Sequence, residues 1–198
     1  MRGFAIIAHV FAPHIWKLCS YEGFMYILGS DKEIIDPELG MLQEALELLD
    51  SKLVSVESEI EASNDPDSDG ILDRGEYFIG LGFVSIQQYL NDTLTFSKVN
   101  KSEALTLGKK HESGVSFISA INAAANWWKH EAEWWKDLDK LNPQSKSTVE
   151  RVSNLIESPW YPLSNLLSVL VKDKECRLLN VLPLLIEWRN AVVTKAGA

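Results

Sequence analysis

Aliphatic residues recur at three- and four-residue steps over residues 37–62, directly after Asp36-Pro37-Glu38. Aspartate is a common capping residue and proline is favoured in a first helical turn, so this tripeptide indicates a helix start. An α-helix has 3.6 residues per turn, and the spacing therefore places the aliphatic side chains on one face. The pattern predicts a long helix with the apolar face Leu39, Leu42, Leu46, Leu49, Leu53, Val56 and Ile60.

The same periodicity continues through most of the chain. The mostly apolar segment from Tyr77 to Leu90 predicts a largely buried, central helix, in which Gly80 and Gly82 permit close contact with a neighbour. Further helices are predicted over residues 102–107, 115–141, 147–157, 163–171 and 177–193.

Proline and capping residues set the expected ends of these helices. We expect Asn142-Pro143 to end the longest one, and Ser147 with Glu150 to form the capping box that begins the next. Pro183 should kink or restart the last helix. Because no repeat, linker or strand alternation is found, the sequence predicts an all-α, irregular single-domain helical bundle over residues 1–198. Residues 1–35 are a possible N-terminal appendage, and residues 63–76 an acidic interhelical loop.

Composition favours a chain that folds by itself. It has 198 residues, 46% of them hydrophobic, which is enough for a substantial core. Two cysteines, Cys19 and Cys176, are too few for a disulfide framework, so a reducing, cytoplasmic location is expected. The apolar run from Phe4 to Ala12 is interrupted by His9 and is too short to span a membrane. It indicates a buried element rather than a signal peptide, and no membrane association is expected.

Charge is distributed unevenly. The net charge is −9, but residues 31–76 hold 15 acidic residues against Lys32, Lys52 and Arg74, a balance of −12. The remainder carries 16 basic and 13 acidic residues, or +3. Such an acidic block attracts cations or a basic partner and repels nucleic acid, although it also fits the solvated face of a helix.

The sequence from Asp65 to Glu76 places side-chain oxygens at the first, third, fifth, ninth and twelfth positions of a twelve-residue loop, with Gly70 at the sixth. It resembles an EF-hand calcium loop, and the resemblance covers only these residues. It implies a Ca²⁺ site, with Ile71 at the position that binds through its backbone carbonyl. The alternative is an acidic surface turn between two helices. The metal ligands implied are Asp65, Asp67, Asp69, Ile71, Asp73 and Glu76.

A second unusual stretch runs from Asn122 to Trp135. On a helical projection, Trp127, Trp128, Trp134 and Trp135 fall on one broad side, which favours core packing. Glu131 projects from the middle of that side and is a candidate buried acceptor for the indole N–H groups or partner of a buried base, or it lies at an exposed bundle end.

Polar residues occupy the opposite side of this helix. Asn126, Lys129, His130 and Glu133 together have groups suited to anion binding or proton transfer, although a solvated helix face also explains them. The segment Asn126-x-x-Lys129-His130 in an all-α chain weakly resembles the HEPN group of helical proteins, many of which are ribonucleases of bacterial toxin or antiphage systems. The resemblance implies a catalytic His130, with Lys129 as the phosphate contact. The defining Arg-to-His spacing of that group is not reproduced, since no His follows Arg189-Asn190.

Two functions are compatible with these patterns. The first is an interaction or regulatory protein with a protein partner, with Ca²⁺ as a possible ligand of one loop. The alternative is a metal-independent ribonuclease of the HEPN type, with RNA as its substrate. Whether the chain catalyses a reaction, and its oligomeric state, are not determined by the sequence.

Overall fold

The computed structural model describes residues 27–28, 34–95, 97–134, 141–172 and 174–197. The chain divides into two compact units, residues 1–37 and residues 38–198. In the first unit, the two-residue strands β1 (Ile27–Leu28) and β2 (Ile34–Ile35) pair antiparallel. The apolar element predicted over residues 4–12 lies outside the described residues.

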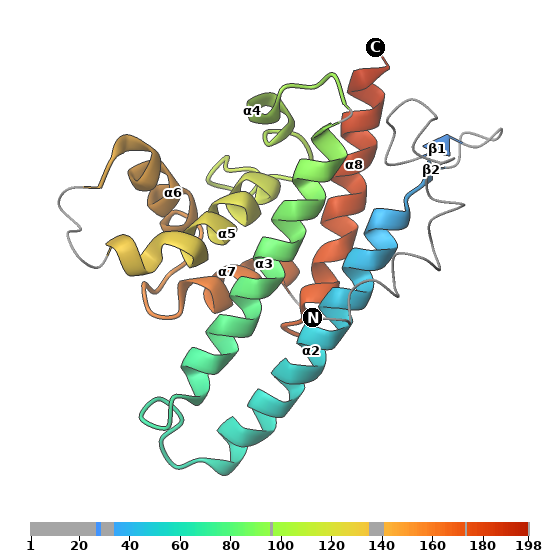
Figure 1. Cartoon of the computed structure of the whole chain (residues 1–198). Coiled ribbons are helices and arrows are strands. Elements are labelled where there is room, and N and C mark those ends of the chain that lie inside the picture. Colours follow the sequence, from blue (N-terminus) through green and yellow to red (C-terminus); the bar gives the residue numbers. More distant parts are fainter. Residues whose placement is uncertain (1–26, 29–33, 96, 135–140, 173, 198) are drawn as a thin grey trace, which may run out of the picture. The chain divides into compact units, whose positions relative to one another are not determined.

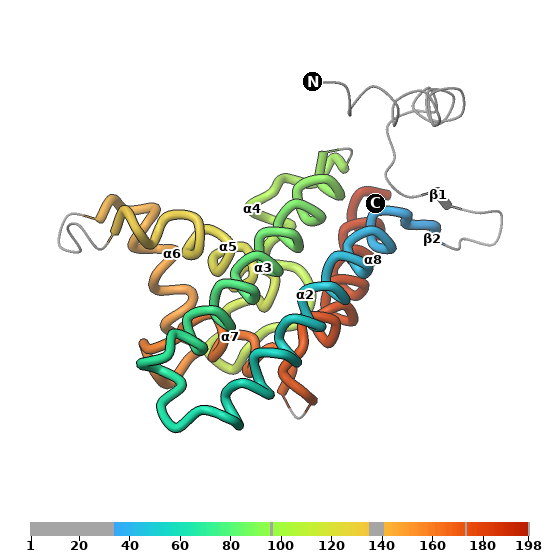
Figure 2. The backbone as a smooth tube through the Cα atoms, turned by 60° about the horizontal axis from the view of Figure 1, so that its bottom comes forward, coloured from blue at the N-terminus to red at the C-terminus, as the bar shows by residue number. Residues whose placement is uncertain are grey.

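The second unit is helical, which confirms the predicted all-α bundle. Helices α2, α3 and α8 run side by side, while α5 packs against both α3 and α6 (Figures 1 and 2). The elements are α2 (Pro37–Ala62), α3 (Ile71–Thr95), α4 (Lys101–Ala104), α5 (Phe117–Trp134), α6 (Pro143–Ser153), α7 (Pro162–Val171), the 3₁₀ helix η2 (Leu178–Val181) and α8 (Leu182–Ala196).

Helix α3 is central, as its apolar sequence predicts. Phe83, Ile86 and Leu90 are fully buried in the core that α3 forms with α5. The two glycines of α3 allow the predicted close contacts: a Cβ on Gly82 would lie 2.5 Å from the Leu178 methyl carbons. Absence of a side chain at this position therefore lets η2 approach α3.

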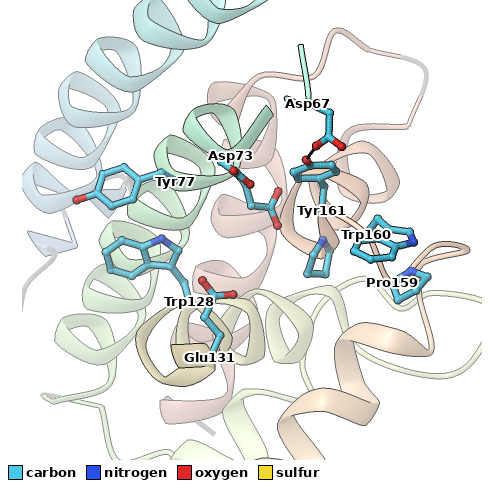
Figure 3. A pocket seen from close by; sticks show the side chains of 10 residues that line it. Asp67, Asp73, Tyr77, Trp128, Glu131, Pro159, Trp160 and Tyr161 are labelled. Atoms are coloured by element: carbon cyan, nitrogen blue, oxygen red, sulfur yellow. Dashed lines mark hydrogen bonds between the residues drawn. The ribbon is translucent and has the colours of Figure 1, made fainter. Parts of the chain in front are cut away.

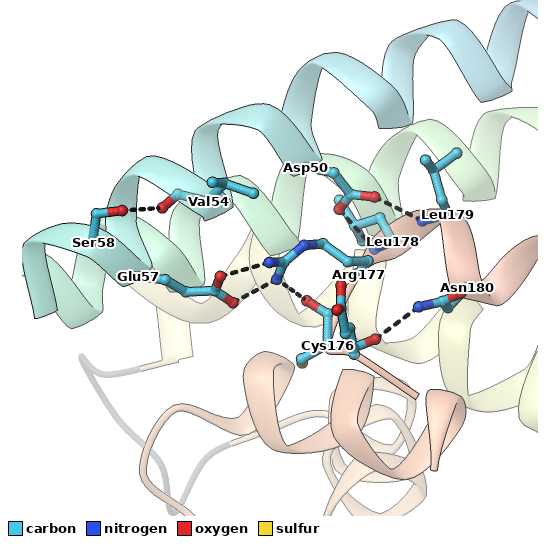
Figure 4. A network of polar contacts seen from close by, with 10 residues as sticks. Asp50, Val54, Glu57, Ser58, Cys176, Arg177, Leu178, Leu179 and Asn180 are labelled. Carbon is cyan, nitrogen blue, oxygen red and sulfur yellow. Dashed lines mark hydrogen bonds and ion pairs between the residues drawn. The ribbon is translucent and has the colours of Figure 1, made fainter. Parts of the chain in front are cut away.

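Helix α2 is held to the core by a buried carboxylate (Figure 4). Asp50 accepts hydrogen bonds from the backbone N–H groups of Leu178 and Leu179 at 2.8 and 3.0 Å, at the start of η2. Beside it, Arg177 donates to both carboxylate oxygens of Glu57 at 2.5 and 2.6 Å. Burial raises the pKa of Asp50, while the two N–H groups and the Arg177 charge lower it. An acidic side chain thus closes the start of a helix more than a hundred residues later in the chain.

The structure corrects the predicted start of α6. The Asn142 Oδ1 accepts a hydrogen bond from the Ser145 backbone N–H at 2.9 Å, and Pro143 stands in the first turn. Asn142-Pro143 therefore begins α6, and the expectation that Ser147 begins it is wrong. The physical reason is that proline fixes a helical φ and lacks the N–H that a first turn leaves unsatisfied.

Two other boundaries bear on the site. Helix α3 begins at Ile71, so the connection from α2 covers residues 63–70 and is shorter than the predicted loop of 63–76. Pro183 lies in the first turn of α8, directly after η2, which confirms that it restarts the last helix. Among the described residues, no helix combines the length and apolar character needed to cross a lipid bilayer.

Candidate binding pocket

A pocket of about 670 Å³ lies between the start of α3, the end of α5 and the segment that leads into α7 (Figure 3). Its volume falls in the range of small-ligand sites. Its lining combines carboxyl groups with aromatic rings, and consists of Asp67, Asp73, Glu76, Tyr77, Trp128, Glu131, Pro159, Trp160, Tyr161 and Pro162.

Glu76 anchors the first turn of α7. Its Oε1 accepts from the Leu163 N–H at 2.7 Å, and its Oε2 accepts from the N–H and the hydroxyl of Ser164 at 2.9 and 2.5 Å. Tyr161 holds the N-cap position but makes no side-chain cap, so Glu76 supplies it from α3. Burial raises the pKa of Glu76, hydrogen bonds from Ser164 and Leu163 lower it, and the Asp73 charge raises it.

Tyr161 joins the acidic loop to the pocket wall. Its hydroxyl donates to the Asp67 carboxylate, which raises the pKa of Tyr161 to about 12. Its backbone has φ 51°, in the left-handed region that a bulky residue rarely adopts. Such a conformation costs of the order of 1 kcal/mol and persists only where surrounding contacts enforce it. The Asp67 contact therefore holds the ring at its hydroxyl, and the backbone of Tyr161 is held by its carbonyl, which accepts from the Asn165 N–H of α7.

Trp128 and Tyr77 form an aromatic wall on the opposite side. Their ring centroids lie 5.5 Å apart at an interplanar angle of 65°. The Trp128 indole rests on Gly80, where a Cβ would lie 1.9 Å from the indole Cδ1. Because the ring is rigid, only glycine permits this approach of α5 to α3.

Glu131 is an indole acceptor, as one of its two sequence interpretations proposed. The Trp127 Nε1–H donates to its Oε2 at 3.1 Å. Burial raises the pKa of Glu131, and the Trp127 hydrogen bond lowers it. Of the predicted core tryptophans, Trp134 is buried, Trp127 and Trp128 are half-buried against the core, and Trp135 lies outside the described residues.

In the part of the chain that the structure describes, Asp67, Asp73, Glu76 and Glu131 form no ion pair with Lys, Arg or His. The charged group that shifts the pKa of Glu76 is itself acidic, the Asp73 carboxylate. A positively charged ligand would therefore meet an unopposed negative potential in this pocket.

The predicted calcium ligands fall into two groups. Asp67, Asp73 and Glu76 line the pocket, and Ile71 is the first residue of α3. Asp65 and Asp69 instead bond within the loop, to the Ser68 N–H at 3.2 Å and to the Ser63 hydroxyl at 2.6 Å. Over the described residues, no three or more His, Cys, Asp or Glu side chains converge as a metal site would require. In this conformation Glu76 is engaged with α7, and calcium binding stays a prediction.

The polar side of α5 is largely engaged in an interhelical network. Gln87 of α3 donates to the side-chain oxygens of Asn122 and Asn126 at 3.0 Å each, and accepts from the Lys129 ammonium at 2.7 Å. Desolvation, then the Lys101 charge, lowers the pKa of Lys129. Asn126 and Lys129 thus hold α5 to α3, a contact that sequence reasoning missed because Gln87 lies within an apolar segment.

His130 and Glu133, the other two candidate residues on the polar side of α5, face solvent. The His130 Nδ1 lies 3.4 Å from a Glu133 carboxylate oxygen, and both side chains are exposed. Arg189, the partial match to the HEPN pattern, is buried and donates to the Asn190 side chain. The structure therefore brings His130 to Glu133 and Lys129 to Gln87.

The sequence prediction also missed the aromatic side of the pocket. Trp160 and Tyr161 stand between Pro159 and Pro162, in the segment that separates the predicted helices 147–157 and 163–171. The available signal was two aromatic residues in a turn, where a core position is not expected. No family model, curated protein or solved structure compared with this chain matches it, so the pocket itself carries the functional argument.

Proposed function

We propose that this chain is an interaction or regulatory module that receives a cationic group of a protein partner in the pocket between α3, α5 and α7. One observation carries the proposal: four carboxyl groups that pair with no basic side chain among the described residues share a pocket with four aromatic side chains. The acidic excess of the surrounding sequence supports it, because a negative field favours the approach of a basic segment.

The aromatic rings and the carboxyl groups act on a cation in complementary ways. A carboxylate neutralises the charge, and a ring face attracts it through its quadrupole while covering its apolar stem. Burial is the main cause that raises the pKa of both Glu76 and Glu131, and a neighbouring carboxylate raises each further, so a bound cation would stabilise their ionised forms. We place this module in the cytosol, as the cysteine content suggests.

Titration with a basic peptide tests the proposal. The probe is a nonapeptide with two arginines and two lysines separated by glycines, and the neutral control carries serine at those four positions. The basic peptide should shift the indole N–H resonances of Trp128 and Trp160, and the neutral peptide should not.

A matched pair of charge-removing variants localises the binding. Glu131→Gln should weaken it about threefold to fivefold, the effect of one partly exposed ion pair. Glu44→Gln removes the same charge from an exposed position on α2 and should leave the affinity nearly unchanged. Equal effects of the two variants would show only a general attraction to an acidic protein, and would refute the pocket.

Ribonuclease activity remains the alternative proposal, supported by the exposed imidazole of His130 beside the Glu133 carboxylate. His130→Ala should then reduce cleavage of total cellular RNA in chelator at least about a hundredfold. Equal, background-level cleavage by wild type and variant would eliminate this alternative.

A further inference from the structure

We infer that the cationic group is the guanidinium of an arginine side chain, stacked on the aromatic walls of the pocket and hydrogen bonded to its free carboxylate oxygens. The inference rests on the proposed binding function, and it names the ligand chemistry of that same site.

Two aromatic walls face each other across the acidic centre. Figure 3 shows Tyr77 and Trp128 on one side of the pocket, Trp160 and Tyr161 on the other, and Asp73 between them. Trp160 is 77% exposed and Tyr77 is 53% exposed, so much of the surface of these two rings is in contact with solvent. A flat ligand that entered here would cover ring surface that is otherwise in contact with water.

Several carboxylate oxygens of the pocket remain available as acceptors. Both carboxylate oxygens of Glu76 accept hydrogen bonds from the start of α7, and the Glu131 Oε2 accepts one from the Trp127 indole N–H. The Asp73 carboxyl makes no hydrogen bond within the described part of the chain. The Asp67 carboxylate uses one oxygen for the Tyr161 hydroxyl. Asp73, together with the second oxygens of Asp67 and Glu131, therefore supplies the acceptors open to a ligand.

This combination favours a guanidinium over an ammonium. The guanidinium is planar and weakly hydrated, stacks on aromatic faces and presents several N–H donors in a fork that matches a carboxylate. A lysine ammonium is a strongly hydrated point charge that gains less from a ring face. A divalent ion is less suited, because the described acidic side chains do not converge on one point.

Three peptides that differ at a single type of position test the inference. They are glycine-spaced nonapeptides with four arginines, four lysines or four citrullines, where citrulline keeps the planar shape without the charge. The arginine peptide should bind about tenfold more tightly than the lysine peptide, and the citrulline peptide should not bind measurably.

Removal of one ring shows whether stacking causes the preference. Trp160→Leu should bring the arginine affinity down to that of the lysine peptide, and Tyr77→Leu should reduce it in part. Both side chains are exposed, so thermal unfolding should show the variants to be folded. Equal binding of arginine and lysine peptides by wild type, still weakened by Glu131→Gln, would overturn the arginine inference and leave the cation pocket intact. Absence of binding by both basic peptides would overturn the binding function itself.

Discussion

Two carboxylates of this protein cap helices that follow much later in the sequence, but their surroundings differ in charge. Asp50 accepts two backbone N–H groups at the start of η2, and Glu76 accepts two at the start of α7. Arg177 lies near Asp50 and lowers its pKa, whereas the charged neighbour of Glu76 is Asp73, which raises the pKa. Both carboxylates cap a helix in the same way. At η2 the positive charge of Arg177 offsets the charge of the carboxylate, whereas at α7 a second acidic group adds to it.

One glycine of α3 lies at the η2 junction, and another lies behind the aromatic wall of the pocket. Gly82 makes room for Leu178, whose N–H is bonded to Asp50, and Gly80 makes room for Trp128 in the pocket wall. The neighbours differ in stiffness, since a leucine can shift its methyl groups and an indole ring cannot bend. The comparison thus predicts that changes at the η2 junction affect stability, while changes at the α7 junction affect both stability and binding.

The largest effect is expected from Asp50→Ala. It removes the acceptors of the Leu178 and Leu179 N–H groups, each bond worth about 1.5 to 3 kcal/mol because the acceptor is charged, so the unfolding free energy should fall by about 3 to 6 kcal/mol. Urea denaturation measures the loss, and Glu44→Ala on the exposed side of the same helix is the control. A loss within about 0.5 kcal/mol would show that η2 does not need this cap.

Glu76→Gln should follow, with a loss of about 2 to 3 kcal/mol in chelator, because the amide N–H₂ would face the N–H donors of α7. Basic-peptide binding should weaken in parallel, whereas Asp50→Asn should leave the binding of its folded form unchanged. If the Glu76→Gln protein were as stable as wild type, Glu76 would not be needed to hold the first turn of α7 in place.

A calcium titration distinguishes two roles of Glu76, the observed cap of α7 and the predicted calcium ligand. If the loop binds Ca²⁺, millimolar calcium should raise the melting temperature of wild type by mass action, and Glu76→Gln should lose most of that gain. The variant would then be destabilised in chelator and also insensitive to calcium. A wild-type melting temperature that calcium leaves unchanged would remove the calcium prediction and leave the α7 cap as the role of this residue.

The glycine pair should give an intermediate effect. Gly80→Ala forces a Cβ into the rigid Trp128 indole and should cost about 1 to 2 kcal/mol, after the helix-propensity gain of alanine is included. Gly82→Ala meets the mobile ends of Leu178 and should cost less. Peptide titration distinguishes the two sites further, because only Gly80→Ala should displace the pocket wall. The reverse order of destabilisation would contradict the stiffness argument.

The smallest effect is a pH dependence at Glu131. Its pKa is raised in the folded state, so the folded protein holds this proton more tightly than the unfolded chain does. The resulting contribution to stability is complete below the ordinary value of 4.5 and declines as the pH rises through the folded pKa. Relative to wild type, Glu131→Gln should therefore gain stability between about pH 4.5 and 7, by less than about 1 kcal/mol for this half-exposed group. Parallel pH profiles of the two proteins would argue against a desolvated Glu131.

Local patterns in the sequence were sufficient for the helices. The span of α2 follows from Asp36-Pro37-Glu38 and the aliphatic spacing, and the restart at Pro183 follows from its missing N–H, because each depends on residues within a few turns. The start of α6 was mispredicted because Asn142-Pro143, interpreted as the end of the preceding helix, instead caps and begins this one. The indole contact of Glu131 was also accessible, since residues four apart share a helix face.

Only the tertiary structure decided what the polar residues do. The sequence placed Glu76 at the end of a loop, yet packing of α7 against α3 sets the bare N–H groups of Leu163 and Ser164 against it, and a buried donor needs an acceptor. Gln87 likewise binds Lys129 because α3 and α5 cross there. The pocket combines segments from about residue 67 to about residue 162, and contacts over such separations are fixed by how the helices pack and not by local propensity. Local sequence thus determined where the helices form, and the packing of these helices determined which acidic side chains remain available to a ligand.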